Sequence, residues 1–160
     1  MNPREGVWDL RGQVFIRSCP PIQRMMVLIF EREQYFPRNG AEDSVMQFVR
    51  GLMSVGLSVT NQRPPIEYVP AMQPDMIAKF IKDTAQRIKM GGPPQLLVCY
   101  LKGKGKSTDE YAAIKRFGDL DVGVATQCLS IQKVMGDIRK QKPNPQCESD
   151  SLFRFGSGWC

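Results

Sequence analysis

The chain has 160 residues, 42% of them hydrophobic and 24% charged, with a net charge of +6 and a pI near 9.2. These values fit one globular domain with a sizeable core and exclude wholesale disorder, and the basic surface favours an anionic partner such as nucleic acid, phosphate or anionic lipid. The chain contains no histidine, which excludes zinc proteases and Ser-His-Asp hydrolases.

No apolar run approaches the roughly 18 residues of a membrane span, and no signal-peptide pattern is present. None of the cysteines forms a C-x-x-C pair, so the sequence offers no zinc site and predicts reduced thiols in an intracellular compartment. Asp119 and Asp121 could bind Mg²⁺ weakly, but the simpler interpretation is that they are turn residues. We therefore expect no metal and no cofactor. The cysteines are Cys19, Cys99, Cys128, Cys147 and Cys160.

Short apolar runs alternate with stretches of helical period along the chain, which predicts an α/β fold with a mostly parallel, four-stranded sheet and helices on both faces. Residues 61–74 contain four prolines and are predicted as a loop or sheet edge. Gly40 is expected to precede the first helix, and Ser107 with Glu110 fits a capping box for the third. The predicted strands are 24–30, 57–60, 95–101 and 119–130, and the predicted helices are 42–54, 75–90, 109–117 and 131–140.

The two ends of the chain differ from its middle. Residues 1–18 are expected to form an N-terminal arm, and residues 19–142 the α/β domain. Residues 143–160 are polar and glycine-rich, and we expect a loose or non-native tail there.

Polar side chains gather where the third and fourth predicted strands end, which is where open parallel sheets bind ligands. The loop 102–108 follows one strand, and Gln127 and Cys128 lie at the end of the other. Tyr111 and Lys115 are four residues apart on the intervening helix and share one face. Together these side chains could form an anion site, although a solvated helix face and a solubilising lysine loop explain the same pattern.

A second interpretation is a degenerate P-loop, because the sequence G-K-S at 105–107 lies between a predicted strand and a predicted helix. The motif needs a glycine five positions before its second glycine, and that position is Tyr100, still inside the strand. The alternative function is nucleotide binding or hydrolysis that uses Lys106 and Ser107. A third interpretation is a protein-interaction module whose basic face is only solvated.

Residues 111–128 read Y-A-A-I-K-R-F-G-D-L-D-V-G-V-A-T-Q-C. This run strongly resembles the MID domain of eukaryotic Argonaute proteins, whose pattern is close to Y-x-x-[IV]-K-R-x-G-D-x-x-x-G-[VM]-x-T-Q-C. The strand Q-L-L-V-C-Y-L and the segment W-D-L-R-G-Q-V-F at 8–15 are also similar to the family, so the resemblance covers residues 8–142. The sequence looks most like a fungal, quelling-type member.

The resemblance implies a Rossmann-like domain that binds the 5′-phosphorylated terminal nucleotide of a small guide RNA in RNA silencing. Tyr111 would stack on the first base and contact the phosphate. Lys115, Gln127 and Cys128 would line the phosphate pocket, and Lys133 would be a further phosphate ligand.

The resemblance also implies a nucleotide-specificity loop, about two residues longer here than in animal relatives. It implies a non-catalytic domain next to a PIWI domain that holds the slicing carboxylates, in a monomeric protein of the cytoplasm or the nucleus. One departure is that no lysine after the last helix matches the one that completes the family's pocket. The loop residues are Lys102, Gly103, Lys104, Gly105, Lys106, Ser107 and Thr108.

Overall fold

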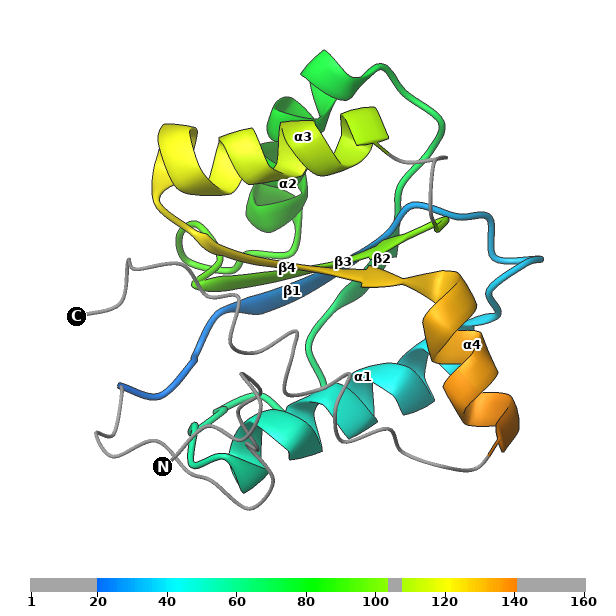
Figure 1. The fold of residues 1–160 in the computed structure, drawn as a ribbon. Helices are drawn as coiled ribbons and strands as arrows, with labels where there is room; N and C mark the ends of the chain where they lie inside the picture. Colours follow the sequence, from blue (N-terminus) through cyan, green and yellow to red (C-terminus); the bar gives the residue numbers. More distant parts are fainter. Residues whose placement is uncertain (1–19, 104–107, 141–160) are drawn as a thin grey trace, which may run out of the picture.

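A computed structural model describes residues 20–103 and 108–140 of the chain. In these ranges four parallel strands form one sheet in the order β2-β1-β3-β4, which confirms the predicted α/β fold (Figure 1). The elements are β1 (Met25–Ile29), α1 (Arg38–Ser54), β2 (Ile66–Tyr68), η1 (Pro74–Met76), α2 (Ile77–Arg87), β3 (Leu96–Leu101), α3 (Thr108–Arg116), η2 (Phe117–Val122), β4 (Ala125–Ser130) and α4 (Ile131–Lys140).

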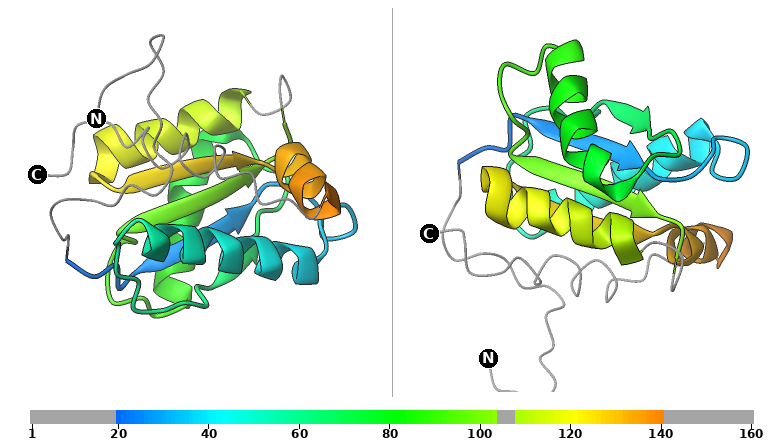
Figure 2. Two further views of the ribbon diagram at one scale, coloured as in Figure 1. Left: turned by 60° about the horizontal axis from the view of Figure 1, so that its bottom comes forward. Right: turned by 90° about the horizontal axis from the view of Figure 1, so that it is seen from above.

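The sheet is covered on both faces, as the unbroken apolar runs of its central strands require. Helices α2 and α3 lie on one face, and α1 and α4 lie on the other (Figures 1 and 2). Successive side chains of a strand point to opposite faces, so Val27 and Ile29 pack toward α1 while Met26 and Leu28 pack toward α2 and α3. All residues of β1 and β3 are buried.

The sheet has a topological switch point between β1 and β3. These strands are neighbours, but the chain leaves β1 for α1 on one face and leaves β3 for α3 on the other. The two connections therefore diverge at the carboxyl ends of the strands, which is where sheets of this type bind ligands. Lys102 and Gly103 follow β3 at this edge.

The prediction of a strand at 57–60 was wrong. Val59 forms only an isolated bridge with Ile22, and the second strand is Ile66–Tyr68, within the segment predicted as loop or edge. This short strand pairs with β1 on one side only. An edge position tolerates nearby prolines because fewer backbone donors are needed there, and the carbonyl of Pro65 accepts a hydrogen bond from Val27 N at 3.0 Å.

The fourth strand is shorter than the predicted 119–130. The first part of that segment continues α3 as the π-helical turn η2, so Asp119 and Asp121 are exposed helix residues rather than turn residues. Gly123 then adopts a left-handed conformation with φ 68°, and β4 begins at Ala125. A glycine is suited to this helix end because it has no Cβ to oppose a positive φ.

Two helices also differ from the prediction by more than one residue at a boundary. Helix α1 begins at Arg38 and therefore contains Gly40, which was predicted to precede the helix. Helix α2 starts at Ile77 after a 3₁₀ turn and ends at Arg87, before a sharp turn in which Lys89 has φ 51° and Gly91 has φ 74°. The last predicted helix is confirmed as α4.

Several predictions fall outside the described residues, namely the N-terminal arm at 1–18, the tail at 143–160 and the Ser107 capping box. Within the residues that the structure describes, no helix has the length and apolar character needed to cross a membrane.

Candidate nucleic-acid-binding site

Lys115 is held between α3 and β4 by two hydrogen bonds. Its Nζ donates to the backbone oxygen of Thr126 at 2.8 Å and to the Oγ1 of the same residue at 2.9 Å. An ammonium group has three donors, so Thr126 accounts for two of them. The positive charge is therefore fixed on the strand rather than carried on a freely rotating side chain.

Gly118 allows the chain after α3 to approach β4 closely enough for this contact. A Cβ at Gly118 would overlap the Thr126 side chain and come within 2.7 Å of the Val124 backbone oxygen. The same approach is fixed by the hydrogen bond from Val124 N to Gly118 O at 2.8 Å. The glycine in the sequence K-R-F-G-D thus helps to place Thr126 beside Lys115.

Cys128 lies two residues beyond Thr126 on the same face of β4. Its thiol hydrogen-bonds to the thiol of Cys99 on β3, and this bond, together with the nearby charge of Lys115, lowers the pKa of Cys128 against the opposing effect of burial. Burial and the Cys128 partner raise the pKa of Cys99 well above its ordinary value. The structure thus brings Lys115 and Cys128, two of the predicted site residues, close together.

Tyr111 lies one turn before Lys115 on α3 and is 44% exposed. An exposed aromatic ring beside a fixed cation offers a stacking surface next to an anion site. The predicted sharing of one helix face by Tyr111 and Lys115 therefore agrees with the observed helix.

Two other predicted residues lie elsewhere. Gln127 lies between Thr126 and Cys128 on β4, so its side chain points to the opposite face of the sheet, toward α1. The Gln127 side chain is buried, with 8% exposed, and its Nε2 donates to Cys128 O at 3.3 Å. Lys133 is exposed in the first turn of α4. Neither side chain joins Lys115 in the space between α3 and β4, and the phosphate roles of both stay predictions.

The predicted specificity loop begins against α4. Gly103 has φ 123°, and a Cβ there would come within 2.9 Å of the Gln132 side chain. The segment after β3 and the first turn of α4 therefore meet at the carboxyl edge of the sheet. Among the loop residues, Lys102 and Thr108 are exposed and Gly103 is half-buried. Lys104, Gly105, Lys106 and Ser107 lie outside the described residues.

The position that a P-loop would need as glycine is filled by a core tyrosine. Tyr100 is fully buried in β3, and its hydroxyl shares a hydrogen bond of 2.8 Å with Ser44 Oγ of α1. The other residues of that interpretation, Lys106 and Ser107, are outside the described ranges. In the described part of the chain, no group of three or more Cys, Asp or Glu residues could hold a metal ion.

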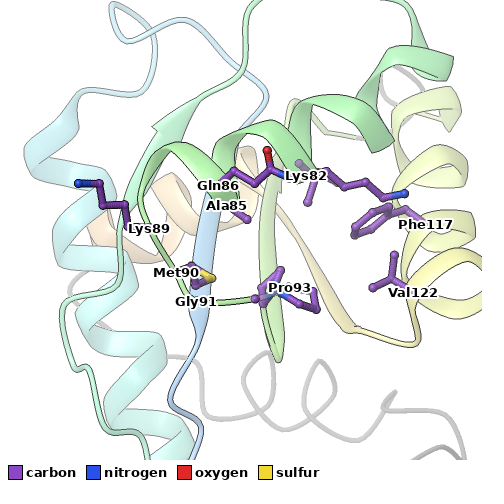
Figure 3. Close-up of a pocket in the computed structure, with 12 residues that line it drawn as sticks. Lys82, Ala85, Gln86, Lys89, Met90, Gly91, Pro93, Phe117 and Val122 are labelled. Carbon is purple, nitrogen blue, oxygen red and sulfur yellow. The ribbon is translucent and has the colours of Figure 1, made fainter.

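A cavity of about 530 Å³ lies at the opposite edge of the sheet (Figure 3). It is lined by the end of α2, by the turn that leads into β3 and by Phe117 and Val122 of η2. Lys82 and Lys89 lie at its rim. None of the described residues that were predicted to bind RNA lines this cavity.

Sequence reasoning missed the parts played by Gly118 and Thr126. Both lie inside the run 111–128 that carried the family resemblance, but their contact joins a helix end to a strand. The sequence did show that a K-R-x-G-D motif and a T-Q-C motif occur in the same run. Only the folded structure shows that residues of the two motifs contact each other.

Comparison with known proteins identifies the family. The family model for the Mid domain of argonaute matches residues 2–86, which is more than half of the chain. The chain therefore belongs to the Argonaute MID family, as its sequence suggested. The run 111–128 lies outside the matched residues, so two separate parts of the chain point to the same family.

Two curated relatives extend the similarity over most of the chain. The argonaute protein of Schizosaccharomyces pombe is 27% identical over 137 residues, which is 84% of this chain and 16% of that protein. Argonaute 4B of Oryza sativa is 24% identical over 134 residues, which is 82% of this chain and 14% of that protein. The chain thus corresponds to a small part of the length of either relative.

Solved structures share the fold. The MID domain of Arabidopsis thaliana AGO5 has a TM-score of 0.57 at 20% identity and covers 82% of this chain and 89% of its own. The MID–PIWI unit of Neurospora crassa QDE-2, a fungal protein, has a TM-score of 0.59 at 20% identity, with 86% and 34% covered. The Argonaute of Kluyveromyces polysporus, solved with a guide RNA, has a TM-score of 0.66 at 14% identity, with 92% and 17% covered.

Proposed function

We propose that this domain binds the 5′-phosphorylated end of a small guide RNA and that it does so without catalysis. The observation that carries the proposal is the fixed ammonium group of Lys115, bound to Thr126 at 2.8 and 2.9 Å beside Cys128. Its place within the run that resembles the MID domain supports an anion as the ligand.

The charge of the ligand explains how such a site selects an RNA end. A terminal phosphate carries nearly two negative charges near neutral pH, as a phosphorylated side chain does, whereas an internal phosphodiester carries one. A fixed ammonium group gains more from the terminal group, because the Coulomb attraction grows with the negative charge of the phosphate. The domain would therefore prefer the end of a strand to its interior.

Stacking would add affinity that depends little on sequence. Base–aromatic stacking contributes about 1–3 kcal/mol per base, and the exposed ring of Tyr111 is the candidate surface. Selection of the first base would then depend on contacts of the loop at 102–108 with the Watson–Crick edge. We propose supporting roles in phosphate binding for Gln127 and Lys133.

The comparisons support this assignment at the level of the family. One structural neighbour was solved with a guide RNA, and another is a MID–PIWI unit. We accordingly propose a 5′-phosphorylated small RNA and a PIWI domain as the partners of this domain, within a monomeric cytoplasmic protein of RNA silencing.

The substitution Lys115→Gln tests the proposal, because glutamine keeps hydrogen-bond donors for Thr126 but removes the charge. We expect it to weaken binding of a 5′-phosphorylated RNA by about tenfold or more, which corresponds to about 1.4 kcal/mol. Binding of the same RNA with a 5′-hydroxyl should change far less. Fluorescence anisotropy with both RNAs measures the two affinities.

Lys82→Gln is the matched control, because it removes the same charge from an exposed position on α2 that lines the distant cavity. It should lower both affinities slightly and equally. If Lys115→Gln behaved like Lys82→Gln, the charge at Lys115 would have no special role and the proposed pocket would be wrong.

A further inference from the structure

Cys99 and Cys128 form a pair of thiols on neighbouring parallel strands. They are direct register partners in β3 and β4, which run side by side in Figure 1, and both belong to the apolar cluster under α2 and α3. Neighbouring strands are about 4.8 Å apart, and disulfides join Cα atoms roughly 4.4–6.8 Å apart. The backbone therefore already holds the two residues at a distance that a disulfide can span.

The two thiols differ in access. Cys99 is fully buried with an exposure of 0%, whereas Cys128 is only partly buried on the outer strand of the sheet. A small oxidant therefore reaches Cys128 first. Lys115 lies close enough to Cys128 for its charge to act on the thiol, and a nearby ammonium group favours the reactive thiolate.

We propose that Cys128 and Cys99 are a peroxide-sensitive dithiol, in which Cys128 is the thiol attacked by peroxide and Cys99 is the thiol that resolves it into a disulfide. The inference rests on the register of β3 and β4, the shared face of the two side chains and their unequal exposure. None of these observations depends on the proposed function.

The chemistry balances with peroxide as the oxidant. The Cys128 thiolate attacks one peroxide oxygen, the O–O bond breaks, and the sulfur is oxidised to a sulfenic acid while hydroxide leaves and takes up a proton as water. Cys99 then loses its proton and attacks the Cys128 sulfur. The S–S bond forms, the S–O bond breaks, and the second oxygen leaves as water.

Mass spectrometry tests the pair in the whole chain with the other cysteines removed by Cys19→Ser, Cys147→Ser and Cys160→Ser. The protein is treated with equimolar hydrogen peroxide, blocked with N-ethylmaleimide and digested with trypsin. Cys99 and Cys128 then fall on separate peptides, 90–102 and 117–133. We expect one species that contains both peptides and that disappears on reduction with dithiothreitol.

Single variants establish the order of the two steps. In Cys99→Val the linked species should be absent, and dimedone should label the sulfenic acid on peptide 117–133. In Cys128→Val the Cys99 thiol should stay reduced. Cys99→Ala and Cys128→Ala repeat the measurement if a valine variant does not fold.

Two results would overturn the inference. One is oxidation of Cys128 in the parent protein to sulfenic or sulfinic acid with no linked species. The other is oxidation of Cys99 in the Cys128 variants as fast as in the parent, because Cys99 would then react without its partner.

Discussion

Polar side chains that are buried in this domain form specific hydrogen bonds. Tyr100 is the clearest case, because its hydroxyl lies inside the apolar strand β3 and meets Ser44 of α1 at 2.8 Å. Burial raises the pKa of Tyr100 to about 12, although the hydrogen bond with Ser44 acts in the opposite direction. Its ring also packs on Phe36, with 5.5 Å between centroids. The tyrosine thus serves the core rather than a ligand.

Tyr100 should make the stability of the domain fall in strongly alkaline solution. The unfolded side chain loses its proton near pH 10, and the folded one near pH 12. The contribution is fully present below pH 10 and is lost as the pH rises from 10 to 12, at about 1.4 kcal/mol per pH unit. Urea unfolding at several pH values in this window measures it.

The double variant Ser44→Ala with Tyr100→Phe is the comparison for that measurement, since it removes both hydroxyls and leaves neither without a partner. The difference in the free energy of unfolding between wild type and variant should shrink as the pH rises. A difference that stays constant between pH 10 and 12 would contradict the raised pKa.

At the scale of elements, the junction of α3, η2 and β4 forms the site. Lys115 comes from the helix, Gly118 from the π-helical turn and Thr126 from the strand. Packing of the turn on the strand leaves no room for a side chain at Gly118. The site is therefore a property of how three elements meet, and it depends on the smallest side chain among them.

Gly118→Ala should destabilise the domain by about 1–3 kcal/mol, because an added methyl group meets the Thr126 side chain and the Val124 carbonyl. The same shift should loosen Lys115 and weaken binding of 5′-phosphorylated RNA. Gly40→Ala in α1 is the matched control, with nothing within 4 Å of its added Cβ. It should be neutral or stabilising by up to about 1 kcal/mol. Equal thermal midpoints for the two variants would contradict the assigned packing.

Much of the fold could be predicted because the central strands are buried on both faces. Such strands appear in a sequence as unbroken apolar runs, and residues 24–30 and 95–101 contain β1 and β3. The edge strand Ile66–Tyr68 could not be found in this way, since it is short and lies among prolines. The segment 57–60 was mistaken for a strand because Leu57 and Val59 pack against the core, although the segment does not join the sheet.

The site could be predicted only in part. The helical spacing of Tyr111 and Lys115 was readable from the sequence. The prediction that Gln127 and Cys128 lie at the end of their strand was wrong, because β4 continues to Ser130 and both residues lie inside it. The face of β4 to which Gln127 belongs depends on the strand register, which the sequence leaves open by one residue. The contact between Lys115 and Thr126 depends on the packing at Gly118, which no local pattern encodes.

For the molecule as a whole, two electrostatic effects act on an RNA. A net charge of +6 attracts any RNA, and this general electrostatic attraction weakens as the salt concentration rises. The fixed charge at Lys115 acts on one phosphate. We expect the logarithm of the affinity for 5′-phosphorylated RNA to fall linearly with the logarithm of salt, with a slope reduced by about 0.7 in Lys115→Gln. An unchanged slope in anisotropy titrations would mean that Lys115 contacts no phosphate.

The most direct test of end recognition is a titration of the unmodified chain with one short RNA that carries either a 5′-phosphate or a 5′-hydroxyl, at two salt concentrations. A pocket for the terminal phosphate predicts tighter binding of the phosphorylated RNA at both concentrations, with the preference retained as the general electrostatic attraction weakens. Equal affinities for the two RNAs that fade together in salt would show a basic surface without an end-binding pocket and would contradict the proposed function.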